Sequence, residues 1–267
     1  MRPAIILSIA GSDPSGGAGI QADIKTISAL GGYAATAITA ITVQNTVGVQ
    51  SVTPVKASVV AAQIKAVLDD LRPHAIKIGM TGSQTVILTL TEALQNYQTC
   101  PVVLDPVMTA TSGHRLMEAE ALETLCWQLF PHCTLVTPNL LETQVILGRT
   151  VTTINEMKSA ARELNDTYGC AFLIKGGHLE GDTMCDVLYD GHQYQLFSAP
   201  RIVTSNLHGT GCTLSSAIAT YLAQGVSLAE SVSQAKAYIS QAIAAASHLH
   251  IGEGNGPLWH SLATSYK

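Results

Sequence analysis

Charged side chains are scarce in this chain of 267 residues: Asp, Glu, Lys and Arg make up 12% of it, against 47% hydrophobic residues. This composition excludes a disordered chain and allows a large buried core. It favours helices and strands that are covered on both faces or by a partner, as in a homo-oligomer. The 14 Lys and Arg residues are scattered singly and the net charge is −5, so the chain lacks a basic stripe for nucleic acid. A small molecule is the expected partner.

Metal-binding cysteine spacing and long apolar runs are also lacking. The six cysteines form no CxxC pair and no His/Cys pattern typical of zinc ligands. We therefore expect reduced, mostly buried thiols. No apolar run reaches 18 residues, and the first apolar segment is too short for the core of a signal peptide. We expect no membrane contact and a cytoplasmic location.

Short apolar runs alternate with segments of helical period along most of the chain. The runs predict strands at 4–9, 34–42, 75–78, 102–104, 135–136 and 171–174. The periodic segments predict helices at 20–30, 58–71, 84–97, 118–129, 140–147 and 154–168. This alternation predicts an α/β fold, with a mostly parallel sheet and helices on both of its faces.

The last third of the chain has a different pattern. Runs at 184–189 and 193–197 flank Asp190-Gly191, a dipeptide typical of a β-hairpin, which predicts an antiparallel edge. Two long helical segments follow, at 213–224 and 228–248. No linker, low-complexity block or repeat interrupts the pattern, so we expect one domain over residues 1–267.

A glycine-rich turn that carries a cysteine, HGTGCT at 208–213, directly precedes one of these helical segments. Unpaired N–H groups and the helix dipole at such an N-terminus could hold a phosphate group in transfer. The same field is expected to lower the pKa of Cys212, so that its thiolate can take a proton from a substrate hydroxyl. The alternative is a turn that only starts a helix, with Cys212 as a small buried residue.

Polar residues follow several of the predicted strands, at the edge where ligands bind in an open parallel sheet. Asp105 and Glu142 are carboxylates in such places, and they suit Mg²⁺, which takes a few carboxylates together with water and phosphate oxygens. Their alternatives are a turn-capping Asp and a Glu that complements a helix dipole. Lys175 also follows a strand, where it could reach a phosphate or simply lie on the surface.

The loop GSDPSGGAG at 11–19 imitates the start of a P-loop, but Gly17-Ala18 stands where a P-loop has Lys and Ser or Thr. We interpret it as a flexible loop that lets a substrate approach the backbone, with an ordinary tight turn as the alternative. Lys236, in the last helical segment, is by itself most simply a lysine on a solvated face.

Seven segments together resemble a known family: AGSDPSGGAGIQAD (10–23), TVQNT (42–46), KIGM (77–80), LDPVM (104–108), TPNLLE (137–142), IKGGH (174–178) and HGTGCTLS (208–215). In this order they resemble the ribokinase-like superfamily, and within it the branch of hydroxymethylpyrimidine kinases and their pyridoxal kinase relatives. The resemblance covers nearly the whole chain. Most of the superfamily ends the catalytic turn in aspartate, whereas this branch has cysteine, as at Cys212.

The resemblance implies a three-layer ribokinase-like fold, a homodimer and the cofactors ATP and Mg²⁺. The implied activity is ATP-dependent phosphorylation of 4-amino-5-hydroxymethyl-2-methylpyrimidine, and then of its monophosphate to the diphosphate, in thiamine biosynthesis. Pyridoxal kinase activity of vitamin B6 salvage is the nearest alternative. A non-catalytic pyrimidine-binding relative and a Cys212 hydrolase using His208 are further alternatives, and the hydrolase lacks a recognisable arrangement of His and acid in the sequence.

The same resemblance implies roles for particular residues. Cys212 would be the base, Gly209, Thr210 and Gly211 would form the anion hole with it, and Lys175 would steady the transferring phosphate. Asp105 and Glu142 would engage Mg²⁺, and Lys236 would lie near the nucleotide. Gln44 would hydrogen-bond the pyrimidine, and the rest of that pocket would comprise Gly11, Ala18, Asp23, Met80 and Val107. Relatives often carry an acidic residue in the loop at 109–116, where this chain has His114.

Overall fold

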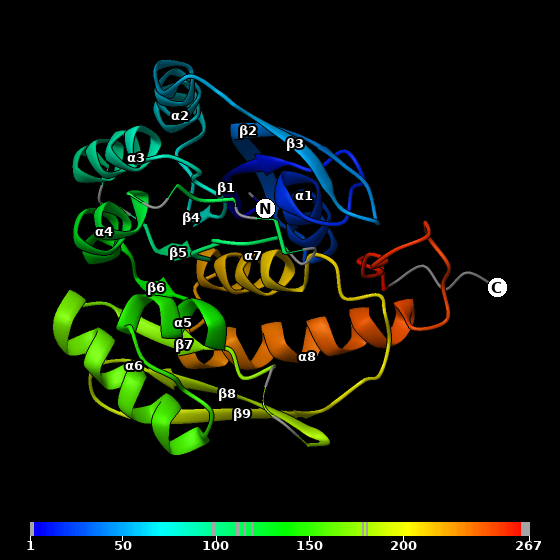
Figure 1. Cartoon of the computed structure of the whole chain (residues 1–267). Coiled ribbons are helices and arrows are strands. Elements are labelled where there is room, and N and C mark those ends of the chain that lie inside the picture. The colour runs from blue at the N-terminus through cyan, green and yellow to red at the C-terminus, as the bar shows by residue number, and fades with distance from the viewer. Residues whose placement is uncertain are drawn as a thin grey trace.

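In the part of the chain that the structure describes, nine strands form one sheet with the order β3-β2-β1-β4-β5-β6-β7-β8-β9 (Figure 1). The computed structural model describes residues 3–97, 100–110, 113–114, 116–118, 120–177, 179 and 181–262. The central strands are parallel to one another, namely β1 (Ile5–Ser12), β2 (Tyr33–Gln44), β4 (Ala75–Ile78), β5 (Val102–Leu104), β6 (Leu135–Val136) and β7 (Ala171–Ile174). The mostly parallel α/β sheet is therefore confirmed.

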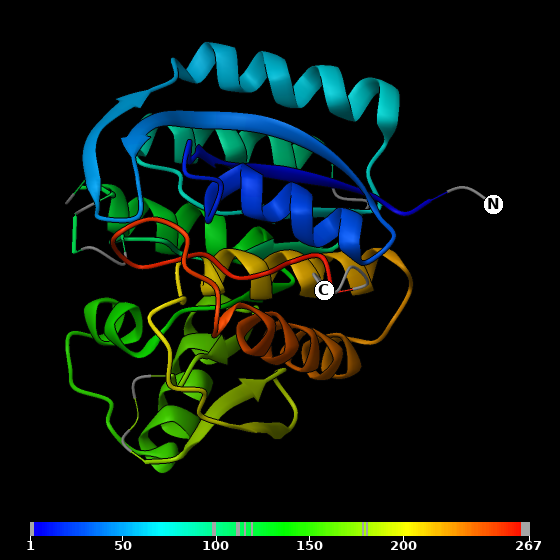
Figure 2. The same ribbon diagram turned by 90° about the vertical axis from the view of Figure 1, so that its right-hand side faces the viewer.

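Helices cover both faces of this sheet. One face carries α2 (Ala57–Leu71), α3 (Gln84–Asn96), α4 (Ala121–Thr124), α5 (Leu140–Leu147) and α6 (Ile154–Tyr168). The other carries α1 (Gly19–Ala29), α7 (Thr210–Ala223) and α8 (Leu228–Ala246), which face the viewer in Figure 2. Successive side chains of a strand point to opposite faces, so Leu7 and Ile9 of β1 enter the first core and Ile6 enters the second.

Both ends of the sheet are antiparallel. The predicted hairpin is present as β8 (Thr183–Tyr189) and β9 (Tyr194–Pro200). The short strand β3 (Val49–Pro54), which pairs antiparallel with β2, was not predicted. A turn connects β2 to β3, and in it the side-chain oxygen of Asn45 accepts hydrogen bonds from the backbone N–H groups of Val47 and Gly48. Asn45 was therefore the local sequence feature that indicated a turn before this strand.

The helix predicted at 118–129 differs from the observed structure. Helix α4 is short and continues as a π-helical turn at Leu125–Leu129 and a 3₁₀ turn at Phe130–His132. Pro131 lacks the N–H that another α-helical turn would need, so the helix cannot continue through it. The change does not disturb the core, because Leu125, Leu129 and Phe130 are all fully buried.

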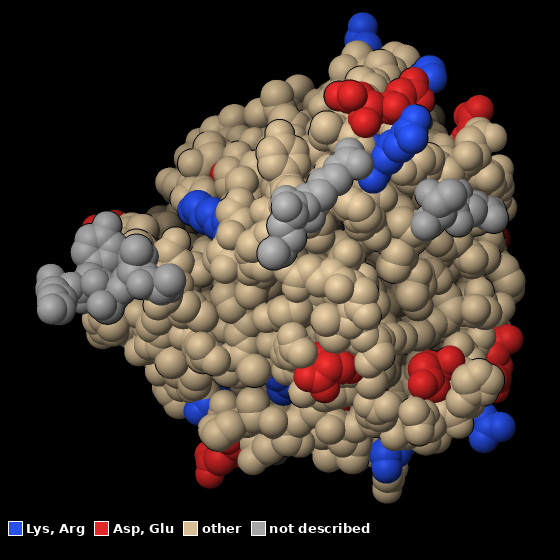
Figure 3. Space-filling model, turned by 180° about the vertical axis from the view of Figure 1, so that it is seen from behind, with Lys and Arg blue, Asp and Glu red and all other residues tan. Residues whose placement is uncertain are grey.

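The surface reflects the low charge of the chain. Charged side chains are few and scattered on the face shown in Figure 3. Within the part of the chain that the structure describes, no helix is long and apolar enough to cross a membrane. All six cysteines are free thiols, and only Cys100 and Cys212 are partly exposed.

Candidate functional site

A cavity of about 640 Å³ lies at the carboxyl ends of the parallel strands. Its wall is built by the segments that directly follow β1, β4, β5, β6 and β7, together with the end of β2 and the first turn of α7. The cavity brings together nearly all of the site residues expected from the sequence: Gly11, Ala18, Gln44, Met80, Asp105, Val107, Glu142, Lys175, Gly209, Thr210, Gly211, Cys212 and Lys236.

The glycines of the turn at 208–213 let its backbone come close to two other segments. Gly209 is the N-cap of α7 with φ +83°, and a Cβ atom there would overlap the carbonyl oxygen of Gly17. A Cβ atom on Gly211 would lie 2.9 Å from Asp105 Oδ2 and 3.4 Å from Lys175 Nζ. The start of α7 therefore faces a lysine and a carboxylate across a narrow gap.

Lys175 and two carboxylates form the charged centre of the cavity. Lys175 Nζ lies 2.6 Å from Asp105 Oδ1. Burial by itself would lower the pKa of Lys175, but the carboxylates of Asp105 and Glu142 outweigh burial and raise it. Burial raises the pKa of Glu142 to about 7, against the opposing charge of Lys175 and with the help of Asp105. Lys175 therefore stays charged where a phosphate could meet it.

Asp105 and Glu142 could bind Mg²⁺ only if most of the other ligands come from water and from the bound phosphates. Glu142 belongs to a capping box at the start of α5, where its Oε2 accepts the backbone N–H of Asn139 at 2.8 Å. Asp105 is held by Lys175 and by the hydroxyl of Thr137. Among the described residues, no group of three His, Cys, Asp or Glu side chains could hold a metal ion. Two oxygen ligands completed by water and phosphate oxygens match the preference of Mg²⁺.

The expected low pKa of Cys212 is not found in this structure. Burial raises the pKa of the thiol to about 11, and the nearby charge of Lys77 opposes this only in part. Asp23 and Asp105 add negative charge that also disfavours the thiolate. The helix N-terminus is visible in the sequence, whereas the desolvation of the thiol and the approach of these carboxylates arise only in the folded chain.

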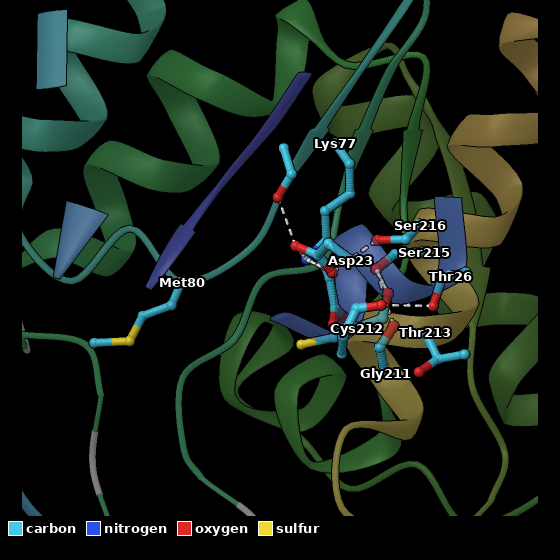
Figure 4. A network of polar contacts seen from close by, with 12 residues as sticks. Asp23, Thr26, Lys77, Met80, Gly211, Cys212, Thr213, Ser215 and Ser216 are labelled. Carbon is cyan, nitrogen blue, oxygen red and sulfur yellow. Dashed lines mark hydrogen bonds and ion pairs between the residues drawn. The ribbon is translucent and has the colours of Figure 1, made fainter. Parts of the chain in front are cut away.

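Asp23 does not lie on the wall of the cavity, contrary to the resemblance-based expectation. Its carboxylate is fully buried, and both of its oxygens lie 2.9 Å from Lys77 Nζ. The hydroxyls of Ser8 and Ser216 donate to it at 2.6 and 2.7 Å. Figure 4 shows Lys77 reaching Asp23, with Cys212 and Ser216 of α7 close by. Asp23 thus ties α1, β1, β4 and α7 together and has no surface left for a substrate.

Lys236 is buried rather than solvated. It is 8% exposed and lines the cavity, and its Nζ lies 2.5 Å from Asp186 Oδ2 on β8. The other oxygen of Asp186 accepts the backbone N–H of Gly176, which directly follows Lys175. Asp186 therefore joins the side chain of Lys236 to the backbone next to Lys175, a role that the sequence did not reveal.

Sequence reasoning also missed a polar pair in the cavity wall. His208 Nε2 lies 2.8 Å from Asp13 Oδ2, although 195 residues separate them in the chain. The same nitrogen is 3.2 Å from Nε2 of Gln44. Asp13 follows β1 directly and His208 opens the glycine-rich turn at 208–213, so their positions were visible in the sequence, but their contact was not.

A second histidine supports the first turn of α7. His260 Nε2 lies 3.0 Å from the hydroxyl of Thr213, and the ring is 4% exposed. Burial, aided by the charge of Lys25, lowers the pKa of His260 from 6.5 to about 4. His260 therefore binds a proton less readily in the folded protein than in the unfolded chain.

Acid is expected to weaken the fold through His260. Between pH 6.5 and 4 the unfolded chain binds the proton and the folded protein does not, so the free energy of unfolding falls as the pH falls. The slope from this group is about 1.4 kcal/mol per pH unit. Urea unfolding at pH 4.5, 5.5 and 7 measures it, with His260→Gln as the variant that cannot titrate. An equal slope in the variant would contradict this origin.

Some expectations fall on residues outside the described part of the chain. His178, the last residue of the IKGGH segment, is one of them, and so are Thr111, Ser112 and Arg115 of the loop at 109–116. The behaviour of that loop around His114 stays a prediction.

Comparison with known proteins gives a consistent family. A family model described as phosphomethylpyrimidine kinase matches residues 13–259. A hydroxymethylpyrimidine/phosphomethylpyrimidine kinase of Rhizobium meliloti is 50% identical over 258 residues, which are 96% of this chain and 97% of the relative. A phosphomethylpyrimidine kinase structure from Clostridium difficile has a TM-score of 0.80 at 42% identity and covers 90% of this chain and 99% of its own.

Pyridoxal kinases share the fold as well. The Staphylococcus aureus pyridoxal kinase, solved in complex with AMP-PCP and pyridoxal, has a TM-score of 0.89 at 34% identity. The match covers 98% of this chain and 95% of the pyridoxal kinase.

Proposed function

Because the chain belongs to the phosphomethylpyrimidine kinase family, we propose that the cavity at the carboxyl ends of its strands is where phosphate passes from ATP to a pyrimidine. The enzyme is a hydroxymethylpyrimidine/phosphomethylpyrimidine kinase of thiamine biosynthesis, and its kinase fold binds ATP. The observation that carries the proposed site is the meeting of Lys175, Asp105 and the start of α7 around Gly211.

Phosphoryl transfer depends on positioning and on neutralising charge more than on covalent chemistry. The N–H groups of Gly209 and Gly211 at the helix start are proposed to bind the transferring phosphate, whereas the N–H of Thr210 donates to the carbonyl of Leu207. Lys175 supplies a positive charge there, and Cys212 takes the proton of the substrate hydroxyl. Asp105 holds Lys175 in place through the 2.6 Å ion pair.

Asp105 and Glu142 would hold Mg²⁺, which supplies further positive charge to the phosphates when it is bound. Both side chains line the cavity beside Lys175, which supports this assignment. Lys236 lies at the same cavity and is proposed to contact the nucleotide, together with Thr210 and Lys175.

The pyrimidine is proposed to occupy the end of the cavity formed by the residues that follow β1, β2, β4 and β5. Gln44 hydrogen-bonds the ring, and the surrounding wall consists of Gly11, Ala18, Met80 and Val107. A Cβ atom on Gly11 would come within 3.1 Å of the Met80 sulfur, so glycine leaves this wall open for a flat ring.

The enzyme is also proposed to be a homodimer of single-domain subunits that acts in the cytoplasm. Apolar side chains are exposed along β2 and the turn after it, with Ile41 at 54% and Val47 at 66%. Tyr33 and Val43 on the same strand are half exposed. These exposed apolar side chains support association through the part of the sheet formed by β2 and β3, because a partner would remove them from water.

The function is tested by measuring ATP consumption in the presence of Mg²⁺ and identifying the products by mass. We expect a monophosphate and then a diphosphate from 4-amino-5-hydroxymethyl-2-methylpyrimidine, with a higher kcat/KM than for pyridoxal. A preference for pyridoxal with only a monophosphate product would contradict the assignment. Binding of the pyrimidine without ATP consumption would contradict catalysis itself.

A further inference from the structure

The pair Asp13 and His208 lies in the cavity wall but has no part in the phosphate chemistry described above. Asp13 is 3% exposed and His208 is 7% exposed, and the atoms that join them lie 2.8 Å apart. An ionised carboxylate only accepts hydrogen bonds, so the proton between them belongs to Nε2 of His208. This fixes which ring nitrogen of His208 carries hydrogen.

Asp13 is well built for this purpose. Its carboxylate also accepts hydrogen bonds from the backbone N–H groups of Ser15 and Ala18 and from the Ser15 hydroxyl, at 2.8 to 2.9 Å. Burial alone would raise the pKa of Asp13, but the hydrogen bonds from His208, Ser15 and Ala18 lower it to about 2. The carboxylate therefore stays ionised at any working pH.

The ring of His208 is held from two further sides. A Cβ atom on Gly17 would overlap its Cδ2 atom, so the glycine of the 11–19 loop is the space that the ring occupies. The backbone N–H of His208 donates to the carbonyl of Gly256 at 3.0 Å. His208 is thus fixed in place, with the hydrogen of Nε2 donated to Asp13 and the same nitrogen 3.2 Å from Nε2 of Gln44.

The carboxamide of Gln44 lies between His208 and Thr42. The Thr42 hydroxyl lies 3.3 Å from Oε1 of Gln44 and 2.9 Å from the carbonyl oxygen of Ser12, and its single proton goes to the closer carbonyl. Nε2 of His208 carries a hydrogen and has no lone pair, so it cannot accept from the amide nitrogen that faces it at 3.2 Å. Exchanging the amide oxygen and nitrogen removes this mismatch, because the oxygen then shares Nε2–H with Asp13 and the nitrogen donates to the Thr42 hydroxyl. One lone pair of the amide oxygen and one amide N–H then remain for a ligand.

This remaining acceptor and donor match one kind of pyrimidine edge. A 4-aminopyrimidine presents an amino donor next to the ring acceptor N3, which is the pattern that a carboxamide pairs with in two hydrogen bonds. A 4-oxo pyrimidine presents the reverse order, an acceptor next to N3–H, and it would require the amide to turn over. Turning it over would place the amide N–H against Nε2–H of His208.

We propose that Asp13 and His208 are positioning residues that fix the orientation of the Gln44 carboxamide, so that the site selects 4-amino over 4-oxo pyrimidines. The proposal rests on the proposed contact between Gln44 and the pyrimidine. It gives a role to two residues of the glycine-rich loop and the catalytic turn that act through Gln44 without touching the reacting atoms.

The test compares kcat/KM for 4-amino-5-hydroxymethyl-2-methylpyrimidine and its 4-oxo counterpart in the wild type and in His208→Phe. Phenylalanine keeps the shape of the ring but has no N–H. We expect the wild type to prefer the 4-amino compound, and the variant to lose about ten- to one-hundredfold of that preference, with most of the change in KM for the 4-amino compound. His208→Gln, which keeps an N–H donor, is expected to restore part of it.

Ser15→Ala is the matched control, because it removes a hydrogen bond to the same Asp13 carboxylate without touching His208. We expect it to leave the preference unchanged. If His208→Phe does not fold, Thr42→Val removes the partner on the other side of the amide at nearly constant volume and should reduce the preference in the same direction.

Two results would overturn the proposal in distinguishable ways. The first result is a wild type that phosphorylates the 4-amino compound, and folded variants that keep the wild-type ratio of kcat/KM between the 4-amino and 4-oxo compounds. It would overturn the positioning role and leave the kinase function intact. A wild type that phosphorylates neither compound would overturn the kinase function as well. Equal losses of kcat for both compounds in His208→Phe would show a purely structural role and would also overturn the proposal.

Discussion

Replacing Cys212 with alanine is expected to slow phosphorylation of the hydroxymethyl alcohol by about 10²- to 10⁴-fold, the usual contribution of a general base. Phosphorylation of the monophosphate should be affected far less. The alcohol must lose a proton during the reaction, whereas a phosphate monoester is already ionised at neutral pH. Single-turnover rates for the two acceptors measure the difference.

The pH dependence of the wild type should differ between the two steps for the same reason. Because burial raises the pKa of Cys212 to about 11, the thiolate is a small fraction at pH 7 and grows about tenfold with each pH unit below that value. The alcohol step should therefore accelerate between pH 7 and 9.5, while the monophosphate step should not show this dependence on Cys212.

Cys100→Ala is the control for these experiments, because Cys100 is also a partly exposed free thiol but does not line the cavity. It should leave both rates unchanged. Equal loss of both rates in Cys212→Ala would instead show that the thiol mainly shapes the phosphate-binding turn.

Replacing Lys77 with methionine is expected to lower the free energy of unfolding by about 3–5 kcal/mol, as found when one partner of a buried ion pair is removed. Lys77 and Asp23 are both 0% exposed, so the variant leaves a buried carboxylate with only the hydroxyls of Ser8 and Ser216 as donors. Urea unfolding followed by circular dichroism measures the loss.

Two control variants show whether the lost stability comes from the unpaired buried charge or simply from removing a lysine side chain. Asp23→Asn combined with Lys77→Met removes both charges and should recover much of the stability. Lys65→Met breaks the exposed pair with Asp69, whose side chains are 76% and 63% exposed, and should cost less than about 1 kcal/mol. A similar loss from Lys65→Met and Lys77→Met would contradict the argument.

Much of the fold could be predicted because its signals are local. The strands β4, β5, β6 and β7 and the helices α5 and α6 begin and end where the apolar runs and periodic segments predicted. Helix α6 is a clear case, since Thr153 and Glu156 form a capping box at its start and Gly169, with φ +75°, ends it. Strand β3 was missed because its side chains are mostly exposed and carry little apolar pattern.

Part of the candidate site could be predicted, because residues that follow parallel strands gather at the carboxyl ends of those strands. Asp105, Glu142 and Lys175 each follow a parallel strand, and they do meet in one cavity. The resemblance to a known family added Gln44 and Lys236, which line the same cavity and whose roles stay predictions. It failed for Asp23, whose partners Ser8, Lys77 and Ser216 come from three other elements that enclose its carboxylate.

The sequence by itself determined the elements of this protein, their mostly parallel arrangement and the glycine-rich turn that carries Cys212, because propensity, periodicity and chain direction act over short distances. Only the tertiary structure decided the charge states and the pairings: the high pKa of Cys212, the buried pair of Asp23 and Lys77, and the contact of Asp13 with His208. Desolvation and hydrogen bonding depend on which distant segments close around a side chain, and that information appears only when the sheet and its two layers of helices are assembled.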